Sequence, residues 1–94
     1  MTLYLKKFGD KLVSRPAGRE AFLAIKSYFI KDLKKNTEIE IDFEGVKVLT
    51  PSWADEVITK LAEKFKNIKL INTNNVTVQA TLKTLKKYSG LNVN

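Results

Sequence analysis

The stretch "DFEGVKVLTPSWADE", residues 42–56, decides how the chain is organised. Its first half continues a run in which Ile39, Ile41 and Phe43 alternate with acidic residues, which is the pattern of a strand with one buried face. Its second half opens a helical pattern, because apolar residues recur from there at intervals of three and four. Only a short polar turn separates the two. A strand that passes so directly into a helix predicts an α/β fold.

Strands are expected on both sides of this stretch. "TLYLKKF" (2–8) predicts a first strand, which could form a hairpin with "KLVS" (11–14) across the turn signal "GD". "EIEIDFE" (38–44) is the clearest strand, and "NIKLIN" (67–72) predicts a short third one.

Helices are expected over residues 15–35, 52–65 and 76–91, and Gly90 is placed to close the last of them. Each segment carries apolar residues at helical spacing, which stacks them on one face. The residues expected to face the core are Phe22, Ile25, Phe29 and Leu33, then Ala54, Val57, Ile58, Leu61 and Phe65, then Val78, Leu82 and Leu85.

The predicted order is β(β)αβαβα, in one domain over residues 1–94, because no repeat or linker interrupts the chain. We expect a small two-layer α/β sandwich with a mixed sheet and with helices mainly on one face. The other sheet face would carry acidic residues, whose repulsion Lys6 and Lys69 on neighbouring strands could offset. These acids are Glu38, Glu40, Asp42 and Glu44.

Composition narrows the function. Among 94 residues there is no Cys and no His, so thiol chemistry and the commonest general base and metal ligand are missing. No apolar run is long enough for a membrane span, and no secretory signal is recognisable. We therefore expect a cytoplasmic, non-enzymatic protein with no cofactor and no metal. Catalysis would have to use carboxylates or Lys, and the carboxylates near the central connection, which could also hold a divalent metal, are Asp42, Glu44, Asp55 and Glu56.

The net charge of +7 is spread unevenly. Residues 1–37 hold nine Lys/Arg and three acids (+6), residues 38–65 hold three and seven (−4), and residues 66–94 hold five and none (+5). A basic protein attracts nucleic acid without specificity. Non-specific binding of nucleic acid is thus the second functional hypothesis. It would act through Lys34, Lys35, Lys83, Lys86 and Lys87.

The central stretch resembles the STAS fold of the anti-sigma-factor antagonists, and most closely its STAS-like branch. "IEIDFEGVKVLTPSWADEV" (39–57) contains an acidic-Phe-x-x-Val run at residues 42–46. It also contains a serine in the turn and an aromatic-Ala-Asp-Glu helix start at residues 53–56. "LVSRPAGRE" (12–20) and "LIN" (70–72) look similar as well. The resemblance implies a regulatory domain that binds a protein partner, such as a kinase-like ATPase or another signalling protein, with no membrane involved.

In the antagonists the corresponding turn reads Asp-Ser-Ser-Gly, and a partner kinase phosphorylates its second Ser. Here Thr50 falls on the Asp, Pro51 on the first Ser, Ser52 on the phosphoacceptor and Trp53 on the Gly. The hydroxyl is retained while its three neighbours differ. The resemblance therefore implies that Ser52 could be phosphorylated. It also places the partner-binding surface at Thr50, Ser52, Trp53, Asp55 and Glu56.

The same residues have a structural interpretation. "SWAD" matches a capping box in which Ser52 caps the helix and Asp55 reaches back. Alternatively, Thr50 is the cap and Pro51 is the first helical residue. Glu56 is spaced to pair with Lys60 one turn later. Trp53 would either pack into the core or stand exposed as an interface anchor.

Two arginines flank the entry to the first predicted helix. Arg15 and Arg19 in "SRPAGRE" could hold a phosphate or another anion beside the helix N-terminus. Alternatively they are solvated, or paired with Glu20 or with the acidic strand face.

Overall fold

The computed structural model describes residues 1–93 and contains a parallel three-stranded sheet in the order β1-β3-β5. These strands are Thr2–Tyr4, Glu38–Asp42 and Asn67–Ile71. A second pair joins β2 (Lys11–Leu12) to β4 (Val48–Leu49), also in parallel. Every strand pairing within residues 1–93 is parallel, so the expected mixed sheet is corrected to a parallel one.

The expected hairpin between residues 2–8 and 11–14 does not form. The first strand ends at Tyr4, and the chain turns through a short 3-10 helix, Leu5–Phe8, and then Gly9 at φ 120°. This turn carries β2 away from β1 and places it beside β4. The hairpin prediction was wrong because the strand does not continue through Leu5. This apolar residue belongs to the 3-10 turn and is buried in the core there.

Two helices start where β2 and β4 end and lie against one another. α1 (Arg15–Ala24) continues as a π-helical segment, Ile25–Phe29. α2 (Pro51–Ala54) runs through a π-helical segment, Asp55–Thr59, into α3 (Lys60–Lys64). The first helix therefore ends before Leu33, which packs against the core from the following loop. α4 (Val76–Tyr88) is the last helix, and Gly90 follows it at φ 67° as expected.

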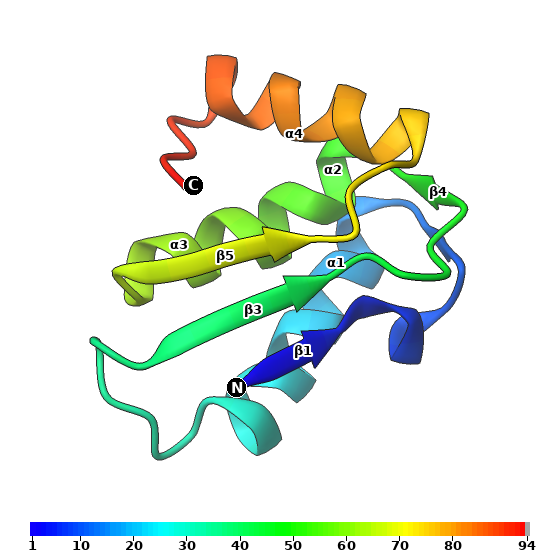
Figure 1. Cartoon of the computed structure of the whole chain (residues 1–94). Coiled ribbons are helices and arrows are strands. Elements are labelled where there is room, and N and C mark those ends of the chain that lie inside the picture. Colours follow the sequence, from blue (N-terminus) through cyan, green and yellow to red (C-terminus); the bar gives the residue numbers. More distant parts are fainter. Residues whose placement is uncertain (94) are drawn as a thin grey trace.

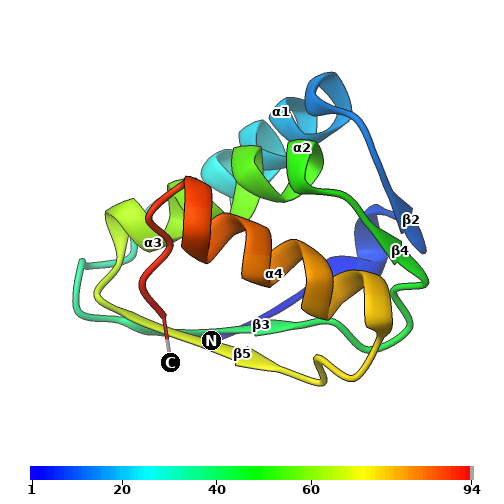
Figure 2. The same cartoon turned by 90° about the horizontal axis from the view of Figure 1, so that it is seen from above.

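The helices cover one face of the three-stranded sheet and leave the other open (Figures 1 and 2). This confirms the two-layer α/β architecture. Glu38 and Glu40 of β3 keep solvent exposure, and Glu40 lies opposite Lys69 in register, as the charge pattern suggested. The chain gives no helix that is both long and apolar enough to cross a membrane, over the residues described.

Asp42 departs from the expected alternation. It is the last residue of β3 and is only 7% exposed, whereas a solvent-facing position was predicted. Its Oδ1 accepts hydrogen bonds from the Glu44 N–H at 2.8 Å and from Asn72 Nδ2 at 2.9 Å. These bonds explain the difference, because a carboxylate with such donors can be buried at the strand end.

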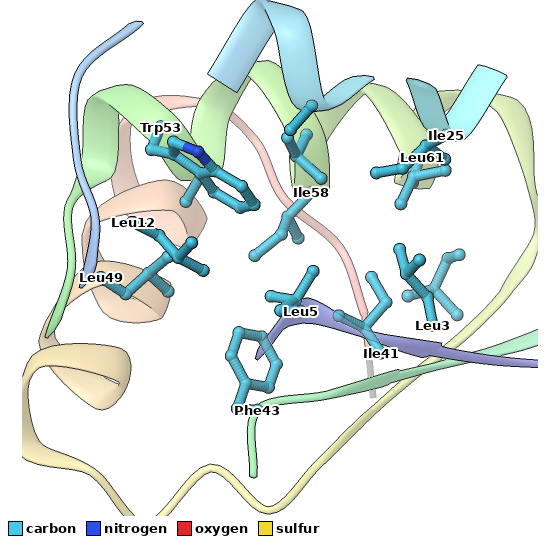
Figure 3. Packing of buried hydrophobic residues seen from close by; sticks show 14 of the residues in the cluster. Leu3, Leu5, Leu12, Ile25, Ile41, Phe43, Leu49, Trp53, Ile58 and Leu61 are labelled. Atoms are coloured by element: carbon cyan, nitrogen blue, oxygen red, sulfur yellow. The ribbon is translucent and has the colours of Figure 1, made fainter. Parts of the chain in front are cut away.

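The core lies between the sheet and the helices. The inward residues of β3, Ile39 and Ile41, are fully buried, and all the residues predicted to face inward from residues 52–65 are buried too. Figure 3 shows Trp53 among Leu12, Leu49 and Ile58, at the end of the core beneath the turn. The helix at residues 51–64 is thus anchored along its whole inner face.

Candidate functional site

The central turn lies where the parallel strands β2 and β4 pass into their helices. Thr50 stands at the N-cap position and Pro51 is the first helical residue, so the second capping alternative is right about the positions but not about a capping hydrogen bond. The Thr50 side chain does not cap the helix, because its hydroxyl donates to the Leu12 carbonyl at 3.3 Å. Ser52 lies in the first turn with its side chain exposed. The prediction that Ser52 is the cap was wrong.

Trp53 points inward and is 2% exposed. Its ring lies 6.2 Å from that of Phe8, centroid to centroid, in a tilted arrangement. An indole so fully buried contributes to folding through its area and its aromatic contact. The interpretation of Trp53 as a core residue is confirmed. The alternative, in which it stands exposed as a partner-binding anchor, is wrong.

Glu56 is the centre of a charge cluster that joins the two helices. Its carboxylate accepts hydrogen bonds from Arg15 Nη1 at 2.7 Å and from Lys60 Nζ at 2.6 Å, and Arg19 Nε lies 3.8 Å away. Its side chain is 8% exposed, whereas those of Arg15 and Lys60 are 41% and 42% exposed. The predicted pair with Lys60 is therefore present, and it belongs to a larger network that the sequence spacing did not indicate.

Asp55 takes part in the same cluster and does not reach back to the turn as a capping residue would. Its Oδ2 accepts a hydrogen bond from Arg15 Nη1 at 3.0 Å. Arg15 thus bridges two adjacent carboxylates from a helix that lies about 40 positions earlier in the chain. No local pattern in the sequence could have identified this contact.

The cluster shifts the acidity of its members. Hydrogen bonds from Lys60 and Arg15 lower the pKa of Glu56, against the effect of burial, which acts to raise it. Burial also acts to raise the pKa of Asp55, but the hydrogen bond from Arg15 and its charge contribute to a net lowering. Both carboxylates are consequently ionised at neutral pH and balanced by the cations around them.

Arg15 and Arg19, which were considered for an anion site, lie beside carboxylates of the protein itself. The guanidinium of Arg15 is already bound to Asp55 and Glu56, and that of Arg19 lies nearest to Glu56. Neither of the partners expected for them, Glu20 and the acidic strand face, is the one observed. The arginines therefore join α1 to the neighbouring helix.

The start of α1 is shaped by two further residues. Ser14 caps the helix, because its Oγ accepts from the Ala17 N–H at 3.3 Å, and it does so with a strained backbone at φ 75°. Gly18 lies against the helix that follows β4. A Cβ on Gly18 would come within 2.8 Å of the Trp53 carbonyl oxygen and 3.0 Å of Glu56 Cβ. Only glycine allows the two helices to approach this closely.

The four carboxylates considered for catalysis or metal binding are divided between separate contacts. Asp42 binds Asn72, Glu44 is exposed, and Asp55 and Glu56 bind Arg15. Within residues 1–93, no group of three or more His, Cys, Asp or Glu side chains is placed to hold a metal ion. These acids therefore form ion pairs and hydrogen bonds within the fold, and the cluster around Glu56 lies beneath the surface of the turn.

The family described as "STAS-like domain of unknown function (DUF4325)" matches residues 24–78. The chain belongs to this family. The match covers β3, the central turn, the helix at residues 51–64 and β5, so it includes the central stretch of the resemblance, residues 39–57, but not residues 12–20. Searches of curated proteins and of solved structures returned no significant match.

In this STAS-like domain, Ser52, which the resemblance set at the antagonists' phosphoacceptor, is exposed, and Trp53, which it set at their glycine, lies in the core. Thr50 is half-buried, Ser52 is exposed and Asp55 is half-buried, whereas Trp53 and Glu56 are buried. The five residues proposed for partner binding thus divide into a surface formed by Thr50, Ser52 and Asp55 and a support formed by Trp53 and Glu56.

The lysines of the second hypothesis, non-specific binding of nucleic acid, fall into two groups that do not form one patch. Lys34 and Lys35 lie in the loop before β3, and Lys83, Lys86 and Lys87 lie on α4. These two elements are at opposite edges of Figure 1. The tyrosines that could add stacking, Tyr4, Tyr28 and Tyr88, are exposed but lie on three different elements.

Proposed function

We propose that this STAS-like domain is a non-enzymatic regulatory module. It would bind a signalling or kinase-like ATPase partner through the exposed surface of the turn, formed by Thr50, Pro51, Ser52 and Asp55. The observation that supports this proposal most is the position of Ser52. Its hydroxyl is exposed in the first turn of a helix whose N-cap side chain forms no capping hydrogen bond. Backbone N–H groups at such a position favour a negative charge.

The electrostatic surroundings also suit a charge at Ser52. Asp55 and Glu56 would repel a phosphate if they were free. Both are bound to cations, and the cluster of Arg15, Arg19 and Lys60 with the two acids carries a net charge of +1 (three positive, two negative). A phosphate at Ser52 would therefore meet a helix N-terminus and a slightly positive cluster. Trp53 points away from the surface and leaves the hydroxyl accessible.

In this proposal the mechanism is partner switching. The unmodified turn presents a neutral hydroxyl beside a cluster whose positive and negative charges nearly balance, which suits a protein contact. Phosphorylation of Ser52 adds close to two negative charges at the centre of that contact. Because a charge buried in an interface without a partner costs binding free energy, the modified turn would release one partner and become available to another.

The test is affinity capture of the tagged chain from its native cells, with nuclease treatment and identification by mass spectrometry. Four forms are compared: wild type, Ser52→Ala, Ser52→Glu and Ser27→Glu. Ser27 is exposed on the π-helical segment of the first helix, so its replacement adds the same charge away from the turn. We expect one stoichiometric protein to be captured by wild type, Ser52→Ala and Ser27→Glu and lost from Ser52→Glu. Capture of the same proteins by Ser52→Glu and wild type would refute the switch. Recovery of only nuclease-sensitive material would favour nucleic acid.

A further inference from the structure

A groove lies at the end of the helices opposite to the turn. It has a volume of about 930 Å³ and runs between the end of the first helix, with its following loop, and the end of α3. Five exposed lysines line it and are called its rim: Lys26, Lys31, Lys35, Lys64 and Lys66. Four buried or half-buried apolar residues are called its floor: Ile30, Leu33, Ala62 and Phe65. Glu63 and Asn92 complete the lining. We call this the lysine groove. In Figure 2 the end of α3 lies at the left, whereas α1 and α2 start at the upper right.

The lysines of the lysine groove are not neutralised by ion pairs within residues 1–93. None of its five lysines forms an ion pair with another residue in the stretch 1–93, and Glu63 is the only acid that lines it. All five side chains are exposed. Like charges gathered around one groove repel one another and raise the local concentration of anions. The rim is therefore complementary to a ligand with several negative charges.

The walls of the groove are fixed to one another. The Lys66 N–H donates to the Lys35 carbonyl at 3.1 Å, and Asn67 Nδ2 donates to the Asn36 carbonyl at 2.9 Å. These bonds join the loop before β3 to the start of β5. The π-helical segment that carries Lys26 ends with a bond from the Ile30 N–H to the Ile25 carbonyl at 3.0 Å. The groove is consequently formed before any ligand binds, which lowers the entropy cost of binding.

The residues of the floor indicate which class of negatively charged ligand fits the groove. Single-stranded nucleic acid is usually held by exposed aromatic rings on which bases stack. The one aromatic residue of the floor, Phe65, is 6% exposed and offers no ring face for stacking. Small ligands are usually enclosed over most of their surface, whereas the rim of this groove is open to solvent. A ligand that places an aliphatic side chain on the floor and carboxylates along the rim needs neither an exposed aromatic ring nor an enclosed cavity.

We propose that the lysine groove binds an extended acidic peptide segment that places one large apolar side chain on the floor formed by Ile30, Leu33, Ala62 and Phe65. The segment belongs to a partner protein and binds independently of the turn. The helix at residues 51–64 has 14 residues, which separates the groove from Ser52 by about 20 Å. One partner could contact both places, or two partners could bind at once.

The first test uses short fluorescein-labelled peptides and fluorescence anisotropy. The probe has aspartates flanking a single leucine, and two control peptides replace either the leucine by serine or the aspartates by lysines. We expect the probe to bind, the serine peptide to bind about tenfold more weakly, and the lysine peptide not to bind. Equal affinity of the leucine and serine peptides would overturn the role of the floor and with it the proposal.

The second test separates the groove from general positive charge. The variant Lys31→Glu/Lys66→Glu reverses one lysine on each wall. The control Lys83→Glu/Lys87→Glu makes the same change in net charge on α4, which does not line the groove. We expect affinity for the probe to fall about tenfold or more in the groove variant and by less than about threefold in the control. An equal loss in both variants would show non-specific attraction and refute the site.

The location and the class of ligand are checked together by backbone NMR of the labelled protein. Addition of the probe peptide should shift the amide signals of Ala62, Lys64 and Lys66 and leave that of Ser52 unchanged. Shifts centred on Ser52 would contradict the proposal and would instead concern the turn. A thymidine oligonucleotide that binds more tightly than the peptide, and loses affinity in the groove variant, would replace the peptide by nucleic acid as the occupant.

Discussion

The two ends of the paired helices carry similar numbers of charged side chains and use them in opposite ways. At the N-terminal end, Arg15 and Lys60 are bound to carboxylates at 3.0 Å or less, around a buried Glu56. At the C-terminal end, the five rim lysines have no such partner in residues 1–93. The comparison teaches that the number of charged side chains does not show which of them hold the fold together, because only the positions of their partners show that.

If the N-terminal end is built for stability, its buried indole should matter most. We expect Trp53→Ala to lower the free energy of unfolding by about 3–5 kcal/mol, because it removes a fully buried aromatic side chain and leaves a cavity. Trp53→Phe should cost clearly less. Urea denaturation followed by circular dichroism measures both. A loss below about 1 kcal/mol for Trp53→Ala would place the indole outside the core.

Removing a charge from the cluster around Glu56 should have the second-largest effect on stability. Glu56→Gln keeps the shape but removes the charge that balances Arg15 and Lys60. We expect a loss of about 1–3 kcal/mol in the free energy of unfolding at pH 7. Glu63→Gln is the matched control, since Glu63 is exposed on α3 and forms no ion pair in the described chain. It should change stability by less than about 0.5 kcal/mol.

The same variant has a pH dependence of known sign. The pKa of Glu56 is lowered in the folded state, so its contribution is fully present above its ordinary value of 4.5 and is lost as the pH falls below it toward the folded-state pKa. The stability difference between wild type and Glu56→Gln should therefore shrink when denaturation is repeated below pH 4.5. A difference that stays constant through this range would show that the charge of Glu56 is not what stabilises the helix pair.

Gly18→Ala should change the free energy of unfolding less, and the sign of the change shows whether the two helices can accommodate a Cβ between them. In an unobstructed helix this change gains about 1 kcal/mol in propensity. At Gly18 the new Cβ would meet the Trp53 carbonyl oxygen at 2.8 Å, and backbone atoms cannot move aside easily. We expect a net loss of about 1–2 kcal/mol, measured by thermal unfolding. Ala17→Gly, at the exposed neighbouring position, calibrates the propensity term alone. A stabilised Gly18→Ala variant would mean that the helices can separate without cost.

The smallest effect is expected at the other end. Lys31→Glu/Lys66→Glu changes two exposed side chains that form no ion pair within residues 1–93, so the free energy of unfolding should stay within about 0.5 kcal/mol of wild type. Thermal unfolding checks this, together with the peptide affinity described above. A large loss of stability would make these lysines structural and remove the contrast between the two ends.

Local patterns in the sequence predicted the elements well where burial follows a fixed period. Ile39 and Ile41 were expected inside and are fully buried, and Val57, Ile58 and Leu61 were correctly assigned to the inner helix face. Periodicity suffices there because each element buries one face against the same core. The family resemblance rested on the same stretch and is confirmed by the match over residues 24–78.

Predictions failed where a contact joins distant parts of the chain. Asp42 was expected in solvent, but Asn72, 30 positions later, provides a donor for its burial. Residues 11–14 looked like half of a hairpin, yet β2 pairs with β4, 37 positions away in register. Arg15 was expected to hold an anion, to be solvated, or to pair with Glu20 or the acidic strand face, because nothing near it indicated Asp55 and Glu56. These contacts depend on tertiary geometry, which no window of a single sequence contains.

The parallel arrangement of the strands also constrains the order in which the chain can fold. Thr2 pairs with Glu40 and Glu38 with Asn67, so strand partners are 38 and 29 positions apart. No strand pair within residues 1–93 closes through a tight turn, the event that lets hairpins form within microseconds. A long loop must be closed before the sheet gains its first hydrogen bonds, and its entropy is lost in advance of that gain. During synthesis, β1 must therefore wait for β3 to emerge from the ribosome, while the first helix can already form.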